Sequence, residues 1–86
     1  MSYQVEVESR AKREFIRLSG EAQERVAEAI DALKRAPRPP GAKRLVGKTG
    51  YRIRLGDFRV LYTIDDQVKL VRIYRIGHRR DVYRGL

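Results

Sequence analysis

The change of hydrophobic period across a short proline-rich segment constrains the fold of this chain more than any other feature. Before residues 37–41, apolar side chains recur at spacings of three and four, whereas after them they alternate with polar ones. Pro37, Pro39 and Pro40 cannot extend a helix, because proline has no amide donor and restricts the residue before it. Helical periodicity on one side and strand periodicity on the other therefore predict helices and strands joined by this loop.

The part of the chain before the loop predicts one strand and two helices. The alternation of apolar and polar residues from Tyr3 to Val7 is typical of a short strand with one buried face. The first helix is expected to begin at Ser9, whose hydroxyl can accept hydrogen bonds from free amides, and the second to follow a break at residues 19 and 20. Their apolar positions are Ala11, Phe15 and Leu18, then Ala22, Val26, Ile30 and Leu33. So short a connection predicts an antiparallel helix pair.

The part after the loop predicts an antiparallel meander. Alternation indicates strands at residues 51–55, 58–64 and 68–76, with turns at Gly56 and Asp57 and at residues 65 and 66. In the third of these strands the apolar phase shifts between Leu70 and Val71, which predicts a bulge at that point or a strand covered on both faces.

These elements together predict an α+β fold in one domain covering residues 1–86. Two antiparallel helices pack on one face of a small, mainly antiparallel four-stranded sheet that includes the N-terminal strand, and a short tail follows residue 78. With no cysteine and one histidine, the chain cannot supply a usual zinc site or a disulfide, so we expect no metal and no cofactor. It has no apolar segment suited to a signal peptide or a membrane span, so we expect a cytoplasmic protein.

The net charge of +9 lies entirely in the second part of the chain. Residues 1–36 carry seven basic and seven acidic side chains, whereas residues 37–86 carry thirteen basic and four acidic ones. So concentrated an excess favours a polyanionic partner, and nucleic acid fits better than a membrane because no segment is basic and amphipathic at helical spacing. An acidic protein partner is a further possibility, and a merely solvated basic surface is the alternative.

Five side chains are expected to meet on the sheet face that the helices leave open. Arg52 and Arg54 alternate with the apolar residues of their strand, and Arg59 does the same on the next strand. Arg79 and Tyr83 follow the last strand back across this face. Guanidinium groups bind phosphate through paired hydrogen bonds and a tyrosine ring can stack on an unpaired base, so the set suits single-stranded RNA. The alternation of arginines is also compatible with an ordinary solvent-facing strand.

Two segments resemble the RelE/ParE superfamily of toxins from toxin–antitoxin pairs. These segments are YRIRLGDFRVLYTIDD at residues 51–66 and IGHRRDVYR at residues 76–84. The resemblance implies a RelE-like ribonuclease that cuts messenger RNA in the ribosomal A site and is neutralised by a RelB-like antitoxin. We therefore expect three partners: an acidic, amphipathic antitoxin in a hetero-oligomer, the ribosome, and messenger RNA.

The resemblance also implies roles for individual residues. It places the family's basic strand residues at Arg52 and Arg54, its phosphate-binding arginine at Arg59, its late arginine at Arg79 and its stacking tyrosine at Tyr83. The first two positions depart from the pattern, because the best-known relatives carry lysines there and one of them acts as the base. Arginine is a poor proton acceptor at neutral pH.

His78 is therefore a candidate for proton transfer, since its side chain alone has an unperturbed pKa near neutrality. We add it to the candidate catalytic residues, and the alternative is a loop histidine with no such role. Further basic side chains are predicted to bind RNA, namely Lys43, Arg44, Lys48, Arg80 and Arg84.

Two other functions remain open at this stage. ParE-like toxins share the fold but poison DNA gyrase, and a non-catalytic relative would bind RNA or ribosomes without cutting. The spacing of Arg79 and Tyr83 favours the ribonuclease, because ParE-like chains typically end before such a pair. The expected chemistry is attack of the RNA 2′-hydroxyl on its own 3′ phosphate, without a metal.

Overall fold

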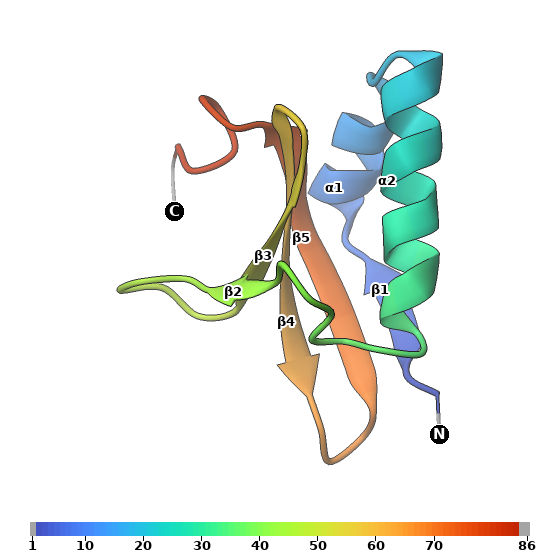
Figure 1. Cartoon of the computed structure of the whole chain (residues 1–86), viewed down its shortest axis with the longest axis vertical. Coiled ribbons are helices and arrows are strands. Elements are labelled where there is room, and N and C mark those ends of the chain that lie inside the picture. The colour runs from blue at the N-terminus through green and yellow to red at the C-terminus, as the bar shows by residue number, and fades with distance from the viewer. Residues whose placement is uncertain (1, 85–86) are drawn as a thin grey trace.

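The computed structural model describes residues 2–84 and shows one sheet covered on one face by two helices (Figure 1). The elements in chain order are β1 Gln4–Val7, α1 Ser9–Ile16, α2 Gly20–Leu33, β2 Lys43–Arg44, β3 Tyr51–Leu55, β4 Phe58–Asp65 and β5 Leu70–His78. The predicted α+β architecture is confirmed. Within residues 2–84, no helix has the length and apolar character needed to cross a bilayer.

The sheet has five strands in the order β1-β5-β4-β3-β2, one more than expected. The additional strand, β2, has two residues, which pair antiparallel with Arg52 and Tyr51 of β3. A strand of two residues carries no readable periodicity, so the count of four was wrong for that reason. β1 pairs parallel to β5, and the other pairings are antiparallel.

The register of β5 changes at Tyr74, and this bulge decides which way the end of the strand faces. Leu61 pairs with Arg75 whereas the next residue, Tyr62, pairs with Ile73, so Tyr74 is the extra residue. The expected position between residues 70 and 71 was wrong, because Val68 lies in the exposed turn before the strand and is not part of its alternation.

The main core lies between the sheet and the helices. Its fully buried residues include Val26 and Leu33 of α2, with Val60 and Tyr62 of β4. The Tyr62 hydroxyl donates a hydrogen bond of 2.7 Å to the Pro37 carbonyl, so it ties the proline loop to the centre of the sheet. Burial, followed by the nearby Tyr51, raises the pKa of Tyr62 to about 12.

A polar cluster joins the proline loop to the turn between β4 and β5. Arg38 donates two hydrogen bonds to the Asp66 carboxylate, at 2.8 and 3.3 Å, and a third of 3.0 Å to the Tyr51 hydroxyl. Tyr3 donates a further bond of 2.6 Å to Asp66. The hydrogen bonds from Arg38 and then Tyr3 lower the pKa of Asp66 to about 2. The cluster therefore connects the N-terminus, the loop and the sheet.

Candidate RNA-binding face

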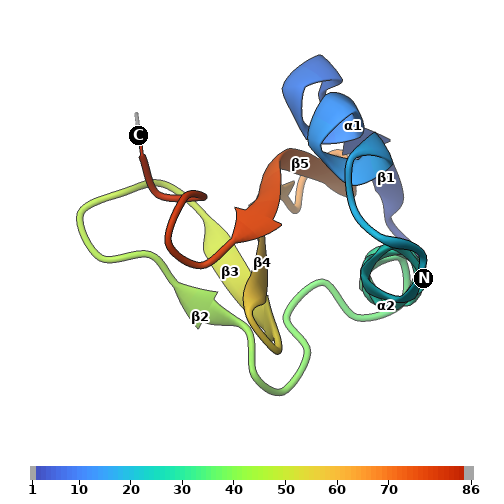
Figure 2. The ribbon, with the colours of Figure 1, turned by 90° about the horizontal axis from the view of Figure 1, so that it is seen from above.

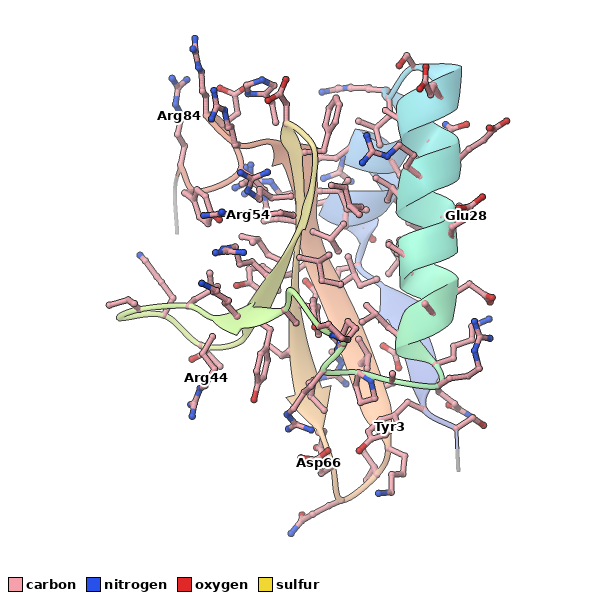
Figure 3. The ribbon with its side chains drawn as sticks, in the orientation of Figure 1. Tyr3, Glu28, Arg44, Arg54, Asp66 and Arg84 are labelled. Atoms are coloured by element: carbon pink, nitrogen blue, oxygen red, sulfur yellow. The ribbon has the colours of Figure 1, made fainter. Side chains whose placement is uncertain are left out.

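The sheet face opposite the two helices, which we call the outer face, carries the predicted strand arginines. Ile53 and Val60 belong to the core on the helix side, so their neighbours Arg52, Arg54 and Arg59 point to the outer face. Figure 2 shows the helices on one side of the sheet, with the C-terminal tail and the loop before β3 on the other. In Figure 3, Arg54 and Arg84 extend on the side away from Glu28 of α2, which agrees with the charge asymmetry of the sequence.

Arg54 and Arg59 lie directly opposite each other in the register of β3 and β4. Like charges in this position cost stability. Among residues 2–84, neither they nor Arg52 form an ion pair. The pair therefore creates an uncompensated positive field, which an anionic group such as a phosphate would relieve.

Arg59 is the most buried member of this set, with 8% of its surface exposed. Its Nη1 donates hydrogen bonds of 2.8 Å to the carbonyls of Gly56 and Phe58, in and beside the β3–β4 turn. These bonds hold the guanidinium in one orientation. A pre-oriented group loses less conformational entropy when it binds a ligand.

Arg79 lies beside the same turn. Its amide donates a 2.7 Å hydrogen bond to the Asp57 carbonyl, and its Nε is 3.8 Å from the Asp57 carboxylate. More than half of each side chain is exposed, 52% for Arg79 and 68% for Asp57, so this ion pair is weak. The turn therefore brings the start of the tail next to Arg59 while leaving the Arg79 side chain accessible.

The tail folds back on the outer face through one apolar side chain. Val82 is fully buried, and its Cβ lies close enough to Gly77 of β5 that a Cβ on that glycine would be 3.9 Å away. The amides of Asp81 and Val82 both donate 2.9 Å hydrogen bonds to the His78 carbonyl, which forms a tight turn. Tyr83 follows with 40% of its surface exposed, as a residue that stacks on a base requires.

His78 does not join the arginines of the outer face. It pairs in register with Phe58, and the two rings meet edge to face at 6.1 Å between centroids. Phe58 lines a small cavity with Ala22 and Val26 of α2, so this pair lies on the helix side of the sheet. The His78 Nδ1 accepts a 3.2 Å hydrogen bond from the Arg80 amide. Only Nε2 is then available to a substrate.

The five residues predicted to bind RNA divide into three groups. Lys43 pairs with Arg52 and so shares its face, whereas Arg44 pairs with Tyr51 and belongs to the opposite face of the sheet. Lys48 lines an open depression with Glu8, Thr49, Thr63 and Tyr74. Arg80 and Arg84 are exposed on the tail, where Arg84 is 3.5 Å from Asp81. The structure thus places Lys43 on the outer face and leaves Arg80 and Arg84 exposed on the tail, whereas Arg44 lies on the opposite face.

Sequence reasoning missed Arg75 and Glu14. Arg75 is only 5% exposed and donates a 3.0 Å hydrogen bond from its Nε to the Glu14 carboxylate. In the sequence Arg75 is one of several arginines in an alternating strand, and Glu14 is one acidic residue of an amphipathic helix. A separation of 61 residues hides their contact.

A separate apolar groove lies between α1 and α2. It has a volume of about 400 Å³ and is lined by Val7, Lys12, Phe15, Ile16, Ala27, Ile30, Asp31 and Lys34. Ile16 at its edge is 72% exposed, which is unusual for a large aliphatic side chain.

Within residues 2–84, no group of three or more histidine or carboxylate side chains could hold a metal ion.

Comparison with known proteins gives one consistent family. Residues 5–83 match the profile described as ParE toxin of type II toxin-antitoxin system, parDE. The chain is 35% identical to Toxin RelG of Mycobacterium tuberculosis (strain ATCC 25618 / H37Rv) over 88 residues, covering 98% of this chain and 99% of that protein.

Solved structures agree with the sequence comparisons. The toxin–antitoxin complex RelBE2 from Mycobacterium tuberculosis matches with a TM-score of 0.81 and 30% identity, over 91% of this chain and 99% of the other. The archaeal RelE–RelB complex from Pyrococcus horikoshii OT3 matches with a TM-score of 0.79 and 26% identity, over 94% and 99%.

The fold, the basic outer face and these matches define the class: the protein is a toxin of a type II toxin–antitoxin system. Within that class, the chain belongs to the RelE/ParE toxin superfamily.

Proposed function

We propose that this toxin is a ribosome-dependent endoribonuclease that cleaves messenger RNA in the ribosomal A site and thereby stops translation. The observation that carries the proposal is the uncompensated pair of Arg54 and Arg59 next to a tail that presents Arg79 and a half-exposed Tyr83. These groups match the phosphate and the base of a single-stranded nucleotide. The similarity to Toxin RelG supports the RelE-type reading.

The proposed reaction uses the RNA as its own nucleophile. The 2′-hydroxyl loses its proton and attacks the adjacent phosphorus, while the bond to the 5′ oxygen breaks and that oxygen takes up a proton. The products are a 2′,3′-cyclic phosphate and a 5′-hydroxyl. Arg52, Arg54 and Arg59 stabilise the charge that develops on the phosphate oxygens, and Arg79 assists the leaving oxygen. Tyr83 stacks on the base and holds the backbone in line for attack.

Proton transfer requires a group other than the arginines, since each remains protonated at neutral pH. His78 is the side chain that the sequence offers for this step, but it packs against Phe58 on the helix side of the sheet, so a direct role requires its Nε2 to reach the substrate around the end of β5. If it acts directly, His78→Gln lowers the cleavage rate by about 10²- to 10⁴-fold. An unchanged rate would assign the proton transfer to the ribosome or to the RNA itself.

The test of the proposal is a reconstituted translation reaction on a defined message, with new RNA ends mapped by primer extension. We expect cuts within the A-site codon that require ribosomes and are lost in Arg79→Ala and Tyr83→Ala. Arg72→Ala is the matched control, because Arg72 is an exposed arginine of the same sheet and forms an ion pair with Glu6 at 3.6 Å. Efficient cutting of free RNA would contradict the dependence on ribosomes, and an intact message would contradict the ribonuclease.

A second candidate function, poisoning of DNA gyrase, is favoured by one observation: the matching family profile is that of the ParE toxin. Trapped DNA cleavage in a gyrase assay tests it directly.

A non-catalytic relative would behave differently again. For that reading, Arg59→Ala and Tyr83→Phe would weaken RNA or ribosome binding, while the native protein would cut no message.

We also propose that the partner is an acidic, amphipathic RelB-like antitoxin in a cytoplasmic hetero-oligomer. The solved relatives include RelE toxins in complex with RelB. The groove between α1 and α2 is mainly apolar and is also lined by Lys12, and by Lys34 paired with Asp31 at 3.3 Å, which suits an amphipathic segment. The complex should weaken modestly with salt and persist through apolar contacts. Complete dissociation at moderate salt would argue against an apolar interface.

A further inference from the structure

The edge of β5 is only partly covered by β1. The parallel pairing ends at Val7 and Ile73, and the last backbone bond runs over 2.9 Å from the Glu8 amide to the Ile73 carbonyl. The chain then turns into α1, while β5 continues to His78. Beyond this point the Ile76 amide donates a 2.9 Å hydrogen bond to Oε1 of Glu14. The Glu14 carboxylate of α1 thus accepts the hydrogen bond that a backbone carbonyl would accept if β1 continued alongside β5.

The other oxygen of Glu14 binds Arg75. The Arg75 Nε donates to Glu14 Oε2 at 3.0 Å, Nη1 to the Arg84 carbonyl at 2.9 Å and Nη2 to the Asp81 carbonyl at 3.3 Å. Every nitrogen of this buried guanidinium therefore has an acceptor. In Figure 2, α1 lies beside the end of β5, and the tail leaves that end on the opposite side. The Arg75 guanidinium connects α1 to the tail.

The two carbonyls that Arg75 binds lie on either side of Tyr83 in the tail. Asp81 closes the turn that carries Arg79, and Arg84 directly follows Tyr83. Apart from this fork, the tail is held by the contacts of Arg79 with Asp57 at its start, by the burial of Val82 and by a few turn hydrogen bonds. A planar, forked guanidinium can hold two carbonyls at a set separation, whereas a lysine ammonium on a flexible stem cannot.

We infer that Arg75, oriented by Glu14, is a positioning residue that holds the end of the tail so that Tyr83 engages RNA on the outer face. The inference rests on the proposed ribonuclease function. A buried ion pair of this kind is weak evidence for stability, because desolvation of the charges offsets much of their attraction. The pair of Arg75 and Glu14 instead contributes by fixing the geometry of the tail. A misplacement of about 1 Å can lower the rate of a positioned reaction about 10²-fold.

The experiment compares Arg75→Lys and Glu14→Gln with the native protein. Arg75→Lys keeps the charge and loses the fork, and Glu14→Gln keeps an oxygen for the Ile76 amide and loses the charge. The matched controls are Arg72→Lys and Glu6→Gln, which change an exposed ion pair between β5 and β1 instead of the buried one between β5 and α1. The first readout is amide hydrogen exchange at Val82 and Arg84, whose amides bond to the carbonyls of His78 and Asp81.

We expect exchange at these two amides to become at least about tenfold faster in both variants, with the amides of β4 unchanged. The second readout is single-turnover cleavage on saturating ribosomes, at a temperature well below unfolding. We expect the rate to fall about 10- to 100-fold, while affinity for the ribosome changes less than about threefold and both controls behave as the native protein.

Unchanged exchange and unchanged cleavage in either folded variant would overturn the inference. So would a lower melting temperature with native exchange at the tail and a native rate, because that result describes a purely stabilising pair. If Arg75→Lys does not fold, Glu14→Gln decides. If the native protein fails to cut, the ribonuclease proposal fails, and the exchange measurements still show whether the pair orders the tail.

Discussion

Replacing Tyr62 by phenylalanine should destabilise the protein at neutral pH and make it relatively more stable at strongly alkaline pH. Tyr62 is fully buried, and its hydroxyl donates the 2.7 Å hydrogen bond to the Pro37 carbonyl. The substitution removes this bond and leaves the carbonyl without its donor, which costs about 1–2 kcal/mol. For a domain of this size, the melting temperature falls by about 4–8 °C for each kcal/mol.

The alkaline part follows from ionisation of the hydroxyl. Burial and the neighbouring Tyr51 raise the pKa of Tyr62 from 10.0 to about 12. The unfolded chain therefore loses the proton first, so stability that is complete below pH 10 is lost as the pH rises toward 12. A difference of that size corresponds to about 2–3 kcal/mol. Phenylalanine has no proton to lose, so the variant escapes this loss.

Urea unfolding followed by far-ultraviolet circular dichroism measures both effects. The native protein should be the more stable one at pH 7, the difference should shrink above pH 10, and near pH 12 it should vanish or reverse. Other groups titrate in this range in both proteins, so their contribution cancels in the difference. Tyr83→Phe, which changes a tyrosine with 40% exposure, should show no such crossing. A constant difference at every pH would refute the reasoning.

Three further predictions concern the acid range, the partner and the RNA. The hydrogen bonds from Arg38 and then Tyr3 lower the pKa of Asp66 from 3.8 to about 2, so their stabilisation is complete above pH 4 and lost as the pH falls to 2. Thermal melts should therefore show native protein and Asp66→Asn converging near pH 2, and a gap that persists there would contradict the ion pair. Ile16→Glu, at a 72% exposed position, should weaken antitoxin binding more than about tenfold in calorimetry. Stability should change by less than about 0.5 kcal/mol and inhibition of translation should persist, whereas unaltered binding would place the antitoxin elsewhere. Arg52→Gln should lower the slope of log K against log salt for single-stranded RNA by about 0.7, and a native slope would mean that Arg52 contacts no phosphate.

Local patterns were sufficient for most of the elements and for the strand arginines. The period of two in β3 places Ile53 in the core, so Arg52 and Arg54 must point away from the helices wherever the strand lies. The glycine at position 56 has a φ of +62°, as expected of the tight turn predicted there. The two helices follow from spacing in the same way. These features depend on residues close together in the chain, and the sequence contains that information directly.

The bulge at Tyr74 marks the point where local patterns fail. Simple alternation from Val71 and Ile73 would place residue 75 on the helix side and residue 78 on the outer face. One extra residue reverses both, so Arg75 faces outward and His78 packs against Phe58. A bulge is decided by pairing with β4, and no pattern within β5 specifies its position. This reversal separates the predicted proton-transfer residue from the arginines.

The sequence alone therefore determined most of the elements, the face of the strand arginines and the family. Only the tertiary structure decided how the tail lies on the sheet, because its holding residues are far apart in the chain. Glu14 reaches Arg75 across 61 residues of sequence, and Arg75 reaches the Arg84 carbonyl across nine. Each side chain alone is compatible with an ordinary exposed charge. Their roles arise because β1 stops short of the end of β5 and leaves an edge that α1 and the tail complete from opposite sides.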